Sequence, residues 1–131
     1  MSNSPSIGFI GAGFMGYGMA HNLLKKNFRL SVIAHNNRIP IEKLIFQGAS
    51  EAKTYKELAN FSDIIIMCVT NTPIAIDVIK KILPDLKKNL LFIDITTHDS
   101  TGSTIINNLL KKNKIRYVES PVMGGPVQAE E

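Results

Sequence analysis

The sequence predicts a single α/β domain, spanning residues 1–131, with a doubly wound parallel sheet. Short apolar runs rich in β-branched residues alternate with segments whose apolar residues recur at helical spacing, which is typical of strands joined by crossover helices. One run, Asp63 to Val69, is apolar almost throughout, as in strands buried on both faces. Three spaced glycines after the first run indicate a tight turn from strand to helix.

The elements are expected to alternate along the chain. The predicted strands are the run that begins at Ile7, Arg29 to Ala34, Asp63 to Val69, Leu90 to Ile95, and Ile115 to Val118. The predicted helices are Phe14 to Lys26, Pro40 through Phe46, Thr54 to Asn60, one that Thr72-Pro73 caps and that ends before Pro84, and one that Thr97 or Asp99 caps and that ends at Lys111-Lys112. On the first of the last two helices, one face is expected to carry Ile76, Ile79, Ile82 and Leu83. On the last helix we expect these residues to be buried: Ile105, Ile106, Leu109 and Leu110.

Composition narrows the functional classes. The chain is 44% hydrophobic and 20% charged, and no apolar run reaches the roughly 18 residues of a membrane span. The N-terminus lacks the pattern of a secretory signal, so we expect a cytoplasmic protein. The net charge of +4 comes with paired lysines at helix ends rather than a basic stripe, which argues against nucleic acid as a partner. The single cysteine, Cys68, is expected to pack as a small hydrophobe, with a redox role as the lesser alternative.

The glycines Gly11, Gly13 and Gly16 fit the pattern G-x-G-x-x-G of a dinucleotide-binding turn. The first allows the tight turn, the second lets the backbone approach a pyrophosphate, and the third lets helix and strand pack closely. The intervening residues, Ala12, Phe14 and Met15, place backbone N–H groups at a helix N-terminus, which favours an anion. The alternative is a glycine turn kept for packing alone.

Ligands of parallel sheets bind beyond the carboxyl ends of the strands, so five loops are expected at the site: residues 11–16, 35–38, 70–72, 96–99 and 121–125. Val69, the last residue of the most apolar predicted strand, and Thr70, which follows it, are expected beside the cofactor. The second strand ends without the acidic residue that usually binds the ribose of NAD. Its loop instead offers Asn36 and Arg38, and an arginine suits a 2′-phosphate, so the sequence predicts NADP, with NAD possible. In the alternative, Arg38 is a solvated loop residue, as His35 is expected to be.

With these motifs and the segment Glu119 to Pro126, the chain resembles the β-hydroxyacid dehydrogenase family, which includes 3-hydroxyisobutyrate dehydrogenase, tartronate semialdehyde reductase and 6-phosphogluconate dehydrogenase. The resemblance implies a Rossmann-type fold and runs from about Ser6 to the last residue. It places Thr97 by the nicotinamide, and it implies that Met123, Gly124 and Gly125 bind the carboxylate end of a substrate.

Two departures qualify what the resemblance implies. Met123 stands where the family has a serine, so the substrate is left open. The family's catalytic lysine comes from a second, all-helical domain, and no lysine here matches it. We therefore expect the cofactor-binding half of an oxidoreductase that moves a hydride between a nicotinamide and a small 3-hydroxy acid or its semialdehyde. No catalytic residue or metal ligand is expected in this chain, which is expected to be inactive alone.

Two other functions stay open: a dinucleotide-binding module without catalysis, and the cofactor domain of an enzyme that reduces imines. A homo-oligomer is possible.

Among the remaining polar residues, Asp94 is expected to tie down loop backbone. His98 is expected in solvent near a helix cap, with a role as proton donor as the lesser alternative. His21, in the first helix, is expected at the surface or in packing.

Overall fold

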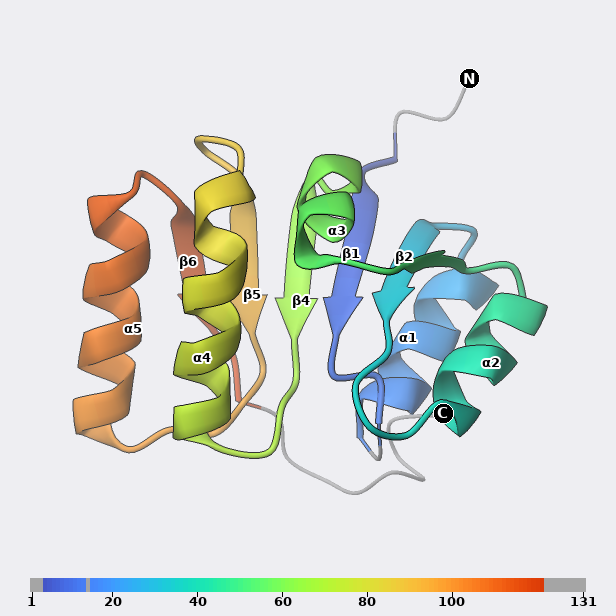
Figure 1. Ribbon diagram of the computed structural model, residues 1–131, viewed down its shortest axis with the longest axis horizontal. Coiled ribbons are helices and arrows are strands. Elements are labelled where there is room, and N and C mark those ends of the chain that lie inside the picture. The colour runs from blue at the N-terminus through green and yellow to red at the C-terminus, as the bar shows by residue number, and fades with distance from the viewer. Residues whose placement is uncertain (1–3, 14, 122–131) are drawn as a thin grey trace.

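A computed structural model describes residues 4–13 and 15–121, and the structural statements below concern those residues. Strands and helices alternate along the chain (Figure 1), in this order: β1 Ser6–Ile10, α1 Gly16–Lys25, β2 Arg29–Ile33, α2 Ile39–Phe46, β3 Ser50–Ala52, α3 Tyr55–Phe61, β4 Ile64–Met67, α4 Thr72–Ile82, a 3-10 turn at Leu83–Asp85, β5 Leu91–Asp94, α5 Ser100–Lys112 and β6 Arg116–Glu119.

The strands form one sheet in the order β3-β2-β1-β4-β5-β6, and every neighbouring pair is parallel. The order reverses between β1 and β4: from β1 the chain builds outward to β3, then returns to β4 on the other side. This arrangement confirms the predicted Rossmann-type sheet. The strand β3 was not predicted, because three residues with a glutamate at the centre show no apolar run.

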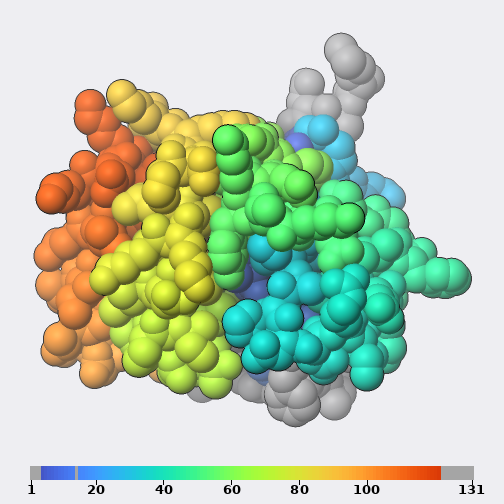
Figure 2. Space-filling model, in the orientation of Figure 1, coloured from blue at the N-terminus to red at the C-terminus, as the bar shows by residue number. Residues whose placement is uncertain are grey.

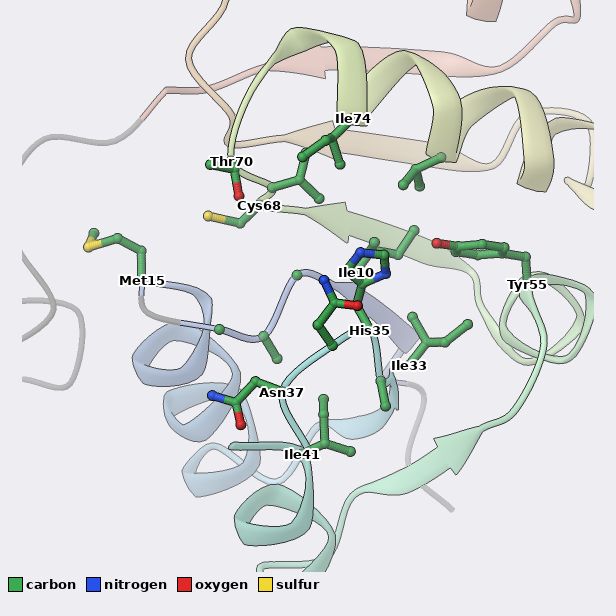
Figure 3. Close-up of a pocket in the computed structure, with 17 residues that line it drawn as sticks. Ile10, Met15, Ile33, His35, Asn37, Ile41, Tyr55, Cys68, Thr70 and Ile74 are labelled. Atoms are coloured by element: carbon green, nitrogen blue, oxygen red, sulfur yellow. The ribbon is translucent and has the colours of Figure 1, made fainter. Parts of the chain in front are cut away.

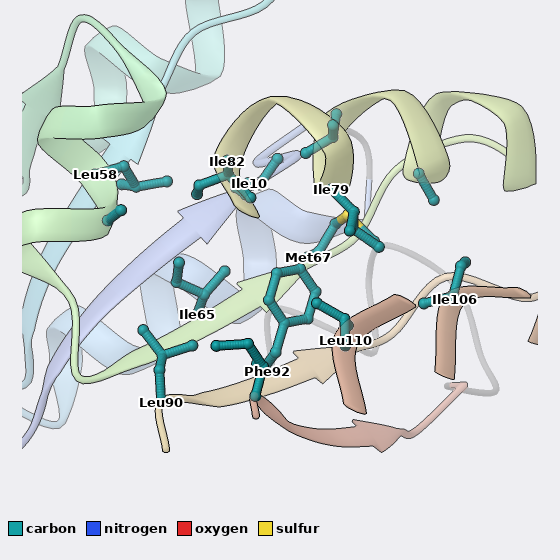
Figure 4. Close-up of a cluster of buried hydrophobic side chains, with 14 of the residues drawn as sticks. Ile10, Leu58, Ile65, Met67, Ile79, Ile82, Leu90, Phe92, Ile106 and Leu110 are labelled. Atoms are coloured by element: carbon teal, nitrogen blue, oxygen red, sulfur yellow. The ribbon is translucent and has the colours of Figure 1, made fainter. Parts of the chain in front are cut away.

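Helices cover both faces of the sheet, and the alternation of side chains along the strands divides the core in two. Phe9 of β1 packs with residues of α1 and α2, in a cluster that includes Ala20 and Leu44. The next residue, Ile10, packs into a second cluster beneath α3, α4 and α5 (Figure 4). Its largest fully buried members are Leu58, Ile65, Met67, Ile79, Ile82, Phe92, Ile106 and Leu110.

Two helix caps refine the expectations from sequence. Asn71, not Thr72-Pro73, caps α4, since its side-chain oxygen accepts from the backbone N–H of Ile74 at 3.0 Å. Asp99, the second of the two alternatives, caps α5 by accepting from the N–H of Gly102 at 2.7 Å. The burial predicted for α5 was wrong at one position, because Ile105 is 47% exposed.

Among the described residues, no helix combines the length and apolar character that crossing a lipid bilayer requires.

Candidate functional site

The glycine turn lies between β1 and α1, at the point where the strand order of the sheet reverses. Gly11 has φ +88°, and a Cβ atom there would overlap the backbone carbonyl oxygen of Cys68, so both conformation and space require glycine. A Cβ atom on Gly13, in contrast, would meet no atom of the described chain within 4 Å. The backbone at Gly13 is therefore open toward a ligand, which is the arrangement that a bound pyrophosphate needs.

The N-terminus of α1 is suited to an anion. Met15 at the N-cap position makes no side-chain capping bond, and the first turn contains no acidic residue. The N–H of Tyr17 already donates to the carbonyl oxygen of Gly13 at 3.0 Å, but the positive end of the helix dipole faces the glycine turn and favours an anion there. Gly16 is buried at the start of this helix, where a Cβ atom would overlap the carbonyl oxygen of Gly11. The residues present thus fit the phosphate groups of a dinucleotide.

A cleft of about 450 Å³ opens at the carboxyl ends of β1, β2 and β4. Figure 3 shows its side chains, which come from both halves of the sheet and from the N-terminal parts of α2, α3 and α4. A second hollow, of about 530 Å³, shares Ile33, Tyr55 and Ile74 with it, and extends between α3 and α4 toward Lys53 and Lys81. In Figure 2 the surface is hollowed between α4 and the segment after β2.

The cleft brings together most of the residues predicted to bind the cofactor: Gly11, Ala12, Gly13, Met15, Asn36, Val69 and Thr70. Phe14, Met123, Gly124 and Gly125 lie outside the described residues. Sequence reasoning missed the apolar walls, made of Ile10, Ile33, Ala34, Ile41, Tyr55, Cys68, Ile74 and Val78. His35 and Asn37, which also line the cleft, belong to the loop 35–38 that was expected at the site. Because ligands bind beyond the carboxyl ends of parallel strands, the wall residues that directly follow β2 and β4 can be inferred from sequence. No local sequence pattern indicates that Tyr55 and Ile74 line the cleft.

Arg38 does not line the cleft but points to β3. Its Nη1 and Nη2 donate to Oε2 and Oε1 of Glu51 at 2.9 and 3.2 Å, and its Nε lies 3.6 Å from Oε1 of Glu42. The hydrogen bond with Arg38 lowers the pKa of Glu51, and the same bond raises the pKa of Arg38. Arg38 is therefore an ion-paired residue in this structure, and its role toward a 2′-phosphate stays a prediction.

The loop after β5 is held by a set of hydrogen bonds around Asp94, which we call the Asp94 network: Thr72, Asp94, Thr96, His98 and Tyr117. The buried Asp94 carboxylate accepts from the backbone N–H of Thr96 at 3.0 Å, from His98 Nε2 at 2.7 Å and from Tyr117 Oη at 2.9 Å. Because a carboxylate only accepts, Nε2 of His98 carries a proton, and the Nδ1 of its neutral form accepts from Thr72 Oγ1, 2.7 Å away.

This network confirms that Asp94 ties down loop backbone, but the expectation for His98 was wrong. The His98 side chain is fully buried between Asp94 and Thr72 rather than solvated. Burial, and then the charge of Asp94, raise the pKa of Tyr117, so the phenol stays protonated and donates. Thr97 lies on the loop that this network fixes; it is exposed and does not line the cleft.

The surroundings of Cys68 and His21 agree with what the sequence predicts for them. Cys68 is partly buried, and burial raises the pKa of its thiol, so its environment does not favour a reactive thiolate. His21 lies at the surface, where its ring stacks on Tyr17 and its Nδ1 is 2.6 Å from Oε1 of Gln47. The described residues contain no group of three or more histidine, cysteine, aspartate or glutamate side chains that could hold a metal ion.

Known proteins share this architecture. Residues 6–131 match the family of the NAD binding domain of 6-phosphogluconate dehydrogenase. The chain is 31% identical to 2-(hydroxymethyl)glutarate dehydrogenase of Eubacterium barkeri over 99% of its length, and 32% identical to mitochondrial 3-hydroxyisobutyrate dehydrogenase of Drosophila melanogaster over 98%. It spans 44% and 40% of those proteins, which is less than half of each.

Solved structures agree on the fold. A 3-hydroxyisobutyrate dehydrogenase of Mycobacterium tuberculosis superposes with a TM-score of 0.91 at 20% identity, covering 97% of this chain and 43% of that one. An imine reductase from Myxococcus stipitatus, in complex with NADP+, superposes with a TM-score of 0.87 at 22% identity, covering 94% and 43%. The matched residues include the glycine turn at the reversal of the strand order and the residues that line the cleft beside it, and so the chain belongs to the family of the NAD-binding domain of 6-phosphogluconate dehydrogenase.

Proposed function

We propose that this chain is the NADP-binding domain of an oxidoreductase that transfers a hydride between the nicotinamide and a small 3-hydroxy acid or its semialdehyde. The observation that carries the proposal is the open backbone at Gly13, in a cleft at the reversal of the strand order. Relatives named for hydroxy acid substrates support the substrate class. A cytoplasmic location is part of the same proposal.

Different residues of the cleft would bind different parts of the cofactor. The glycine turn and the N-terminus of α1 would hold the pyrophosphate, and the apolar wall of Ile33, Tyr55 and Ile74 offers flat contact for adenosine. When bound, the nicotinamide supplies or accepts the hydride. A carbonyl that gains a hydride develops negative charge on oxygen, which a proton donor must neutralise. We propose that this donor lies in the part of the protein that corresponds to the rest of its longer relatives.

Calorimetric titration of the 131-residue chain with NAD and NADP tests the proposal. Binding of either dinucleotide supports the assigned ligand class, and binding of neither contradicts it.

NADP is expected to bind more tightly than NAD, and Arg38→Ala is expected to remove most of the difference, which should be about tenfold. No acidic residue ends β2 to repel a phosphate, and Arg38 follows two residues that line the cleft, Asn36 and Asn37. Paired titrations at low salt measure the ratio. If Arg38→Ala keeps the ratio of the unaltered chain, Arg38 does not bind the 2′-phosphate.

The 131-residue chain is expected to bind cofactor without oxidising 3-hydroxyisobutyrate, glycerate or 6-phosphogluconate. It spans less than half of the relatives named as dehydrogenases, and the family resemblance places the catalytic lysine in the other half. Absorbance of the reduced nicotinamide at saturating NADP measures this. Turnover that is lost in His98→Asn would place the proton donor in this chain instead.

A reductase acting on imines is the second candidate, favoured by the superposition on an imine reductase and by Met123 in place of the family's serine. Substrate profiling of the longest protein encoded with this sequence, with carbonyl and imine substrates side by side, separates the two. Cofactor binding without activity toward either class would favour a non-catalytic module.

A further inference from the structure

We propose that Glu51 sets the cofactor preference of this cleft, because a ribose 2′-phosphate must displace the Glu51 carboxylate before it can bind Arg38. This inference rests on the proposed function, since it assumes that a dinucleotide occupies the cleft. Glu51 belongs to β3 and lies outside the cleft. Neither the positions of the strand ends nor the glycine turn identify it as a residue of the site.

The donor geometry of Arg38 carries the argument. A guanidinium binds a phosphate well only when it presents two parallel N–H groups. Its terminal pair is already used, since Nη1 and Nη2 bind the two oxygens of Glu51 at 2.9 and 3.2 Å. Its lateral edge faces a second carboxylate, since Nε lies 3.6 Å from Oε1 of Glu42. A phosphate therefore gains the terminal N–H pair of Arg38 only if Glu51 releases it.

The backbone explains why Glu51 is in place to compete. Glu51 pairs in register with Val32 of β2, and Arg38 is the N-cap residue of α2, the helix that joins β2 to β3. Arg38 directly follows Asn36 and Asn37, which line the cleft. The Arg38 side chain is 52% exposed, so no surrounding core packs it in place, while that of Glu51, on the strand, is 23% exposed.

The charges around Arg38 oppose a phosphate. Two carboxylates, Glu42 and Glu51, face one guanidinium, so the departure of Arg38 leaves both carboxylates near an incoming dianion. Lys53 offsets a small part of this charge, since the hydrogen bond with Arg38 lowers the pKa of Glu51 most and the charge of Lys53 lowers it least. The preference for NADP should consequently be smaller than an unpaired arginine would give, and removing the charge of Glu51 should increase it.

The test is calorimetric titration of the 131-residue chain and of Glu51→Gln, each with NAD, NADP, 5′-AMP and 2′,5′-ADP. Glutamine keeps the shape of Glu51 but not its charge. We expect Glu51→Gln to bind NADP and 2′,5′-ADP about two- to fivefold more tightly, the size of one surface ion pair, with NAD and 5′-AMP unchanged. Glu42→Gln is the matched control, expected to have a smaller effect because its contact is longer and not bidentate.

The outcomes separate this inference from the proposed function. Weaker NADP binding by Glu51→Gln would mean that Glu51 orients Arg38 for the phosphate, and would overturn the competition. An equal change for NAD and NADP, or an effect that persists in Arg38→Ala/Glu51→Gln, would overturn it too. If the unaltered chain binds no nucleotide, the proposed function itself fails, whatever Glu51 does. The NADP-to-NAD ratio within each variant cancels any loss of folded protein.

Discussion

Replacing Gly13 by valine is expected to weaken dinucleotide binding at least a hundredfold, which corresponds to about 2.7 kcal/mol or more, while leaving the fold intact. A Cβ atom at this position meets no atom of the described chain within 4 Å, so the side chain extends into the open cleft without disturbing the core. It would occupy the space through which the pyrophosphate must approach the backbone. Titration of Gly13→Val with NAD and NADP, beside its thermal melting curve, measures both effects.

Gly11→Ala is the control, because we expect it to lower the stability of the fold rather than to block the ligand directly. Its methyl group would overlap the carbonyl of Cys68, at a φ of +88° that alanine rarely adopts, so this variant should lose stability first and binding only as a consequence. Gly13→Ala should give an intermediate loss of affinity. If Gly13→Val binds as the unaltered chain does, the pyrophosphate does not lie against Gly13 and the assigned binding mode is wrong.

Asp94→Ala is expected to lower the free energy of unfolding by about 3 kcal/mol, and Tm by about 10 °C. The substitution removes the acceptor of three donors, which are the N–H of Thr96, His98 Nε2 and Tyr117 Oη. Because Asp94 and the His98 side chain are fully buried, water does not readily replace the lost acceptor. Urea denaturation and differential scanning calorimetry measure the change.

Asp77→Ala serves as the matched control for the loss of a carboxylate. Asp77 likewise contacts a side chain four residues away, the ammonium of Lys81 at 2.8 Å, but both side chains are more than half exposed. Water solvates the partner that remains, so its Tm should stay close to that of the unaltered chain. An Asp94→Ala variant that melts like Asp77→Ala would show that the Asp94 network does not stabilise the fold.

The sequence was sufficient for the order of all the elements except β3 and for the glycine turn, because both depend on local patterns. Apolar runs such as Ile64 to Met67 form strands, and Gly11 and Gly13 mark where β1 ends. The strand β3 was missed because its pairing with β2, at Ser31 and Val32, leaves no pattern of its own. Loops beyond strand ends followed from topology, which is why Asn36 and Thr70 were found in the cleft.

Contacts between distant segments could not be predicted in the same way. His98 has no apolar neighbours in sequence that suggest burial, yet Thr72, 26 residues away, and Asp94 enclose its ring. Arg38 has the sequence context of a free loop arginine, but Glu51 lies 13 residues further on and meets it only because β3 pairs with β2. In both cases the partner is set by the register of neighbouring strands, which local sequence does not encode.

The reversal of strand order between β1 and β4 also bears on when the cleft forms during folding. β1 pairs on one side with β2, the next strand along the chain, and on the other side with β4. Directly before β4, the side chain of Asp63 accepts a hydrogen bond from the N–H of Ser6, which is 57 residues away in sequence. Closing the longer loop costs more chain entropy, so the pairing of β1 with β4 is expected to follow that of β1 with β2. Since the walls of the cleft come from both sides of this junction, the cleft is complete only after the two halves of the sheet have joined.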